Sequence, residues 1–108
     1  MNQKDIVLAR FPYTNLVDYK IRPAVIVSNE KFNSIHAYLL ACPITSKSTL
    51  HEYELELTVG NFSGDLKEKS FVRADGVTAI EKDLILKEIG TISDSLFNSL
   101  KERIMKNF

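Results

Sequence analysis

Residues 22–27 read Arg-Pro-Ala-Val-Ile-Val, and this stretch marks the centre of the predicted fold. The apolar run Ala24 to Val27 has no polar position, which predicts a strand buried on both faces. Pro23 disfavours the helical region for the residue before it, so Arg22 is expected to be extended. The sequence therefore places a guanidinium at the mouth of a central strand.

Further strand patterns lie on both sides of this centre. Residues 5–11 (DIVLARF) predict a strand that ends at Pro12, followed by a polar loop over residues 12–21. Residues 28–34 are expected to form a turn, and residues 35–42 a second central strand that stops at Pro43.

The second half of the chain predicts short strands and a closing helix. In HEYELEL (residues 51–57) the apolar positions alternate with Glu52, Glu54 and Glu56, as expected of a half-buried strand. Gly60 and Gly64 are expected to bracket a turn. The remaining expected strands are Ser70–Arg73, Val77–Ile80 and Lys87–Ile92. A helix should start at Ser93-Asp94 and bury Leu96, Leu100, Ile104 and Phe108.

The length of the chain limits its organisation. With 108 residues and 12.3 kDa it can bury one core, so residues 1–108 are interpreted as a single domain. About five to seven short strands and one terminal helix predict a mainly β fold, a small bent barrel with the helix covering an open end or face.

Composition argues against several classes of protein. A single cysteine, Cys42, and the absence of a leader pattern indicate an intracellular protein, and no apolar run is long enough for a membrane span. His36 and His51 lie in different segments without other ligands at metal-binding spacing, so no metal site is predicted. No cofactor motif is present.

Polar residues gather at the ends of predicted strands. Arg22 precedes one strand, Thr45 and Ser46 follow another, and Arg73 and Asp75 flank a third. If the first two strands are neighbours, a guanidinium and two hydroxyls would meet at one rim and suit a phosphate. The alternatives are a structural ion pair for Arg22 and a plain turn at Thr45-Ser46.

These segments together carry a family resemblance. The motifs are DIVLARFPYTNL (5–16), KIRPAVIVSN (20–29), CPITS (42–46), FVRADGVTAI (71–80) and EIGTIS (88–93), followed by an amphipathic helix. In this order they resemble the MazF/PemK/Kid family of bacterial toxins. The resemblance implies an SH3-like β-barrel with a C-terminal helix, a cytoplasmic homodimer, and a metal-independent mRNA endoribonuclease that acts on single-stranded RNA. A cognate antitoxin is the implied protein partner, with DNA contacted only through the toxin–antitoxin complex.

The resemblance also implies roles for single residues. Arg22 and Thr45 match the positions assigned to catalysis in the family. Asp75 is the expected general base, with an ion pair to Arg73 as the alternative. The expected RNA contacts are Tyr13, Thr14, Lys20, Ser46, Lys47 and Arg73. Gly76 stands where the family has a glutamine, which bears on base specificity. His51 is a secondary candidate for acid–base work.

Two other functions are compatible with the same fold. One is a toxin that poisons DNA gyrase, as the related CcdB family does, although the RPA and PITS motifs favour the ribonuclease. The other is an SH3-like binding module without catalysis.

The charge of the chain fits a small RNA footprint. The 14 basic and 14 acidic residues cancel, but residues 1–50 carry six basic and three acidic side chains, and residues 51–108 carry eight and eleven. We therefore expect a short electropositive groove that engages few phosphates.

Overall fold

The computed structural model describes residues 1–12, 19–48 and 51–108, which form eight strands, two α-helices and two 3₁₀ turns. The strands are β1 (Asp5–Pro12), β2 (Tyr19–Ile26), β3 (Tyr38–Thr45), β4 (Glu54–Leu57), β5 (Phe62–Gly64), β6 (Ser70–Arg73), β7 (Thr78–Glu81) and β8 (Ile85–Ile92). The helices are α1 (Glu30–Ile35) and α2 (Asp94–Met105), and the turns are η1 (Ala74–Gly76) and η2 (Lys82–Leu84).

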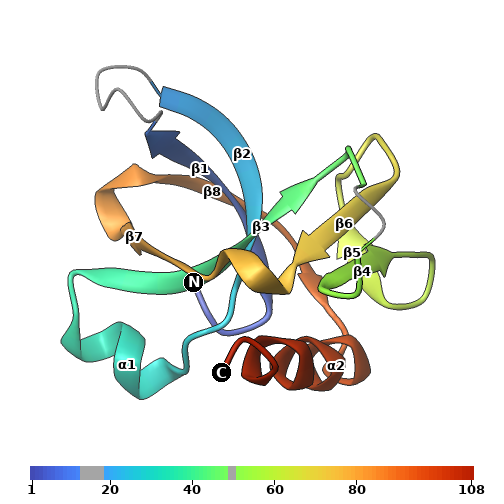
Figure 1. Cartoon of the computed structure of the whole chain (residues 1–108). Coiled ribbons are helices and arrows are strands. Elements are labelled where there is room, and N and C mark those ends of the chain that lie inside the picture. The colour runs from blue at the N-terminus through green and yellow to red at the C-terminus, as the bar shows by residue number, and fades with distance from the viewer. Residues whose placement is uncertain (13–18, 49–50) are drawn as a thin grey trace.

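The strands form one antiparallel sheet that bends into a nearly closed barrel. Its order is β4-β6-β3-β2-β1-β8-β5, with β7 paired to β3. Figure 1 shows the strands curling around the centre of the molecule, with α2 lying beneath them. The predicted mainly β barrel with a C-terminal helix is confirmed, with eight strands in the described residues where about five to seven were expected.

Strand β3 organises the sheet because it pairs with three other strands. It pairs with β2 along one edge, and with β7 and then β6 along the other. The prediction that this strand stops at Pro43 is wrong, since β3 continues to Thr45. Proline lacks an N–H and cannot donate a hydrogen bond to a neighbouring strand. Pro43 lies between the part of β3 that pairs with β7 and the part that pairs with β6, and at this point it faces Gly76 of η1.

Both faces of the central strands are buried. Val25 packs with Ile6 and Leu100 in a cluster between the sheet and α2, while Ala24 and Ile26 pack in a second cluster that includes Leu39. The expectation that the Ala24 run is buried on both faces is confirmed for residues 24–26. Each fully buried Val, Leu or Ile side chain of these clusters contributes about 1.5–3 kcal/mol relative to exposure.

Local predictions elsewhere need correction. Strand β2 begins at Tyr19, inside the expected loop, because residues 19–25 pair with β1. Helix α1 (Glu30–Ile35) takes the place of the expected turn over 28–34 and of the start of the strand expected over 35–42, so β3 begins only at Tyr38. The Asn29 side chain accepts a hydrogen bond from the Phe32 N–H at 2.8 Å and caps this helix. Strand β4 begins at Glu54, not at His51. The turn expected between Gly60 and Gly64 covers only residues 60–61, because β5 occupies Phe62–Gly64.

Helix α2 starts as predicted. The Ser93 hydroxyl accepts a hydrogen bond from the Leu96 N–H at 3.1 Å and caps the first turn. Leu96 and Leu100 are buried as expected, but Phe108 is 94% exposed because the helix ends at Met105. Phe97, which does not belong to the predicted four-residue repeat, is buried. Among the described residues, no helix has the length and apolar character needed to cross a membrane.

Candidate active site

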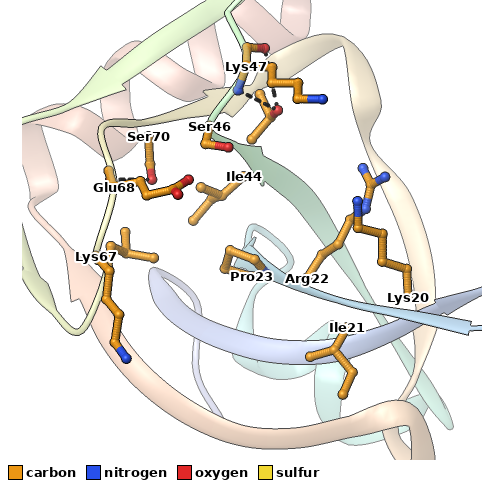
Figure 2. Close-up of a pocket in the computed structure, with 12 residues that line it drawn as sticks. Lys20, Ile21, Arg22, Pro23, Ile44, Ser46, Lys47, Lys67, Glu68 and Ser70 are labelled. Carbon is orange, nitrogen blue, oxygen red and sulfur yellow. Dashed lines mark hydrogen bonds between the residues drawn. The ribbon is translucent and has the colours of Figure 1, made fainter.

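A pocket of about 530 Å³ opens where β2, the end of β3 and the segment before β6 meet. Figure 2 shows these three parts of the chain facing a common space. The residues that line it are Lys20, Ile21, Arg22, Pro23, Ile44, Thr45, Ser46, Lys47, Leu66, Lys67, Glu68 and Ser70. Two motifs that lie far apart in the sequence, around Arg22 and around Thr45, therefore share one pocket.

Strand β2 supplies the first wall. Arg22 and Lys20 are two residues apart on this strand, so their side chains lie on the same face. Figure 2 shows Arg22 and Lys20 on the same side of the pocket. Arg22 is half-buried and its register is fixed by pairing with Ala9 of β1. The wall is thus a positioned pair of cations.

The end of β3 supplies the second wall. The Thr45 hydroxyl accepts a hydrogen bond from the Lys47 N–H at 3.1 Å, which bends the chain directly after the strand. The turn exposes Ser46 and Lys47 at the rim, and Figure 2 shows the Ser46 side chain directed toward the pocket. Thr45 therefore makes the turn that the sequence allowed as an alternative, and also lines the pocket.

Residues 66–70 form a third wall that sequence reasoning missed. The register between β3 and β6 pairs Thr45 with Phe71 and so brings the preceding residues, among them Lys67 and Glu68, alongside the Thr45 turn. The buried Ser70 donates a hydrogen bond from its hydroxyl to the Glu68 carbonyl at 2.8 Å. In sequence this segment looks like an ordinary exposed loop, and only the pairing of β6 with β3 could have revealed it.

Arg73 and Asp75 do not line this pocket. They form an ion pair with Nη2 of Arg73 at 2.9 Å from Oδ2 of Asp75. The hydrogen bond from Arg73 lowers the pKa of the Asp75 carboxyl, and the same bond raises the pKa of Arg73. His51 belongs to this group, because its Nε2 lies 3.8 Å from Asp75 Oδ2 and its Nδ1 accepts a hydrogen bond from the Tyr53 N–H at 3.2 Å.

The other chemically interesting residues lie apart from the pocket. Burial, with a smaller effect of Asp75, raises the pKa of the Cys42 thiol to about 12, so this cysteine is an unreactive part of the core. His36 stacks on Tyr38 with ring centres 4.9 Å apart. Tyr13 and Thr14 lie outside the described residues. No cluster of three metal-binding side chains occurs in the described ranges.

The pocket has the chemistry of a phosphodiester site. Four cationic side chains, from Lys20, Arg22, Lys47 and Lys67, surround two hydroxyls of the Thr45 turn and one carboxylate. Guanidinium and ammonium groups neutralise phosphate oxygens, and hydroxyls add directional hydrogen bonds. The apolar floor, which includes Pro23 and Ile44, offers a surface for a base or sugar.

Comparison with known proteins gives a consistent result. A family model described as "PemK-like, MazF-like toxin of type II toxin-antitoxin system" matches residues 2–108. An endoribonuclease in complex with its cognate antitoxin from a mycobacterial species has a TM-score of 0.80 at 16% identity, covering 98% of this chain and 92% of that chain. No curated protein sequence gives a significant match.

Two further solved structures are similar. A MazE–MazF structure from Deinococcus radiodurans has a TM-score of 0.78 at 17% identity, covering 95% of this chain and 91% of that chain. The Mycobacterium tuberculosis toxin MazF-mt6 has a TM-score of 0.76 at 24% identity, covering 93% and 91%. At these identities the structural likeness establishes a common fold.

Proposed function

The chain belongs to the family of PemK-like, MazF-like toxins of type II toxin–antitoxin systems, and we propose that it is a metal-independent endoribonuclease that cleaves single-stranded mRNA. The observation that carries the proposal is the shared pocket of Arg22 and the Thr45-Ser46 turn. A phosphate held there would meet the guanidinium of Arg22 on one side and hydroxyl donors on another.

The reaction that such a site supports is attack of a ribose 2′-OH on the adjacent phosphorus. The O2′–P bond forms as the P–O5′ bond breaks, leaving a 2′,3′-cyclic phosphate and a 5′-OH. Arg22 would stabilise the negative charge that develops on the non-bridging oxygens, and the hydroxyls of Thr45 and Ser46 would hydrogen-bond the same oxygens. Lys20, Lys47 and Lys67 would hold the flanking phosphates.

The protein partners follow from the family. We propose that a cognate antitoxin binds this chain in the cytoplasm and covers the pocket, and that the active toxin is a homodimer. The solved relatives described as an endoribonuclease with its cognate antitoxin and as MazE–MazF support this assignment. Contact with DNA would then occur only through the toxin–antitoxin complex.

The test is cleavage of a long, unstructured RNA by the purified protein in EDTA. We expect 2′,3′-cyclic phosphate ends, and a loss of about 10²- to 10³-fold in rate for Arg22→Ala, as for removal of an oxyanion stabiliser. Thr45→Ala should also lose activity. Lys87→Ala and Thr78→Ala, which alter exposed residues away from the pocket, are the matched controls.

Circular dichroism would verify that each variant is folded. RNA left intact by folded, antitoxin-free protein would refute the proposal. Inhibition of gyrase supercoiling by the same intact preparation would then favour the gyrase-poisoning alternative.

A further inference from the structure

Glu68 provides the only carboxylate among the described residues that line the pocket. Around it are Arg22 and Lys20 from β2, Lys47 after β3, and Lys67 on its own segment. Lys69, the next residue, turns to Glu56 of β4, with Nζ 3.5 Å from Oε2. A carboxylate repels phosphate, so attraction of the RNA backbone does not account for Glu68 at this position.

The backbone at Glu68 is held in place although its side chain is exposed. Its carbonyl accepts the hydrogen bond from Ser70, and Ser70 is buried at the start of β6, where it pairs with Leu57. Within the described residues, no hydrogen bond or ion pair engages the Glu68 carboxylate. The side chain is therefore anchored at its base and free to accept a proton at its end.

Glu68 and Arg22 lie on opposite walls. Figure 2 shows the Glu68 carboxylate directed inward toward Ser46 and Ile44, with Arg22 and Lys20 across the pocket. Displacement at phosphorus is in line, so the attacking 2′-oxygen and the leaving 5′-oxygen lie on opposite sides of the phosphorus. A proton acceptor on one wall and cations on the other match that requirement.

We propose that Glu68 is the general base of the cleavage reaction, an inference that rests on the proposed ribonuclease function. Glu68 takes the proton of the 2′-OH as the O2′–P bond forms and the P–O5′ bond breaks. The departing 5′-oxygen takes a proton from water or from the cationic wall, and Glu68 returns its own proton to solvent. Asp75, held by Arg73 outside the pocket, then has a structural role.

Removal of Glu68 should have opposite effects on RNA binding and on the rate of cleavage. Without the carboxylate the pocket is more positive, so RNA should bind as tightly or more tightly. A general base contributes about 10²- to 10⁴-fold to the rate of the chemical step. Glu68→Gln should therefore lower kcat by about that factor while KM stays constant or falls.

The experiment measures single-turnover and steady-state cleavage of one RNA, whose wild-type cleavage site has been mapped, by the full protein chain at neutral pH. Glu68→Gln should lose most of kcat. Glu68→Asp should retain part of the activity. Added formate should restore part of the activity of Glu68→Ala. Glu102→Gln, the same change on the exposed face of α2, is the control and should match the wild type.

The outcomes separate the two proposals. An inert wild-type protein would refute the ribonuclease function and the role of Glu68 with it. An active wild type together with a Glu68→Gln variant that keeps kcat within about threefold would refute only the general base. A variant that cuts equally fast at different sequences would show that Glu68 reads a base, and would also overturn the proposal.

Discussion

Arg73 holds the carboxylate of Asp75 with two hydrogen bonds, from Nε at 3.3 Å and from Nη2 at 2.9 Å. The pair spans the junction between β6 and η1, which also contacts Pro43 of β3 through Gly76. A carboxylate in this arrangement is engaged by its partner and is a weak proton acceptor, because the ion pair lowers its pKa. Geometry thus favours the structural alternative for Asp75.

Asp75→Asn should lower stability at neutral pH by at most about 1 kcal/mol, as for other exposed ion pairs. The hydrogen bond from Arg73 lowers the pKa of Asp75 from its ordinary 3.8, so the stabilisation is present above that pH and disappears as the pH falls through the folded-state pKa. Urea unfolding at pH 7 and pH 3 should show the difference between wild type and variant shrinking at the lower pH. Asp83→Asn, on an exposed turn, is the control; a difference independent of pH would contradict the explanation.

Gly90→Ala should destabilise the barrel by about 1–3 kcal/mol, as overpacking does. Gly90 of β8 pairs with Gly64 of β5, and a Cβ at position 90 would lie 2.8 Å from the Gly64 Cα and even closer to the Ser63 carbonyl. Thermal unfolding should show the loss as a fall in Tm. Gly60→Ala is the comparison, because a methyl group there lies in open space and its only cost is the positive φ of Gly60. An unchanged Tm for Gly90→Ala would mean that β5 and β8 can separate freely.

Ser93→Ala should cost about 1 kcal/mol of stability, because it leaves the Leu96 N–H without its cap. The helix it caps buries Leu100 and Phe97 against the barrel, so fraying of the first turn loosens this packing. Ser99→Ala makes the same chemical change at an exposed position inside α2 and should be neutral or slightly stabilising. Equal effects of the two substitutions, measured by urea unfolding, would argue against the cap.

Much of the fold was readable from sequence because its signals are local. The buried run after Pro23 and the cap at Ser93 each depend on residues close together in the chain, and both were predicted correctly. The end of β3 was predicted wrongly because a proline is tolerated wherever its edge of the strand lacks a hydrogen-bonding partner. Here the neighbour of Pro43 on that edge is η1, which lies more than 30 residues after Pro43 in the chain.

Part of the site could likewise be predicted from sequence, and part could not. Arg22 and Thr45 could be expected near each other once their strands were taken as neighbours, and β2 does pair with β3. Lys67 and Glu68 carry no pattern of their own, and the antiparallel register of β6 on β3 brings them to the pocket. The roles of all these residues stay predictions until the variants are measured.

Lys67→Ala should make RNA binding less dependent on salt. Binding to single strands changes with a slope of about −0.7 in log K against log salt for each phosphate neutralised, so the four cations of the pocket set a limit near −3 for one site. Because Lys67 lines the pocket, its removal should reduce the slope by about 0.7 and weaken binding at low salt more than at high salt. Fluorescence anisotropy with a labelled single-stranded RNA, at salt concentrations from about 50 to about 300 mM, measures both the affinity and its slope against salt. Lys87→Ala removes the same charge from an exposed position on β8, outside the pocket lining, and should leave the slope unchanged. An equal change in slope for the two variants would mean that RNA senses the overall charge of the protein, and that the pocket is not where the strand is held.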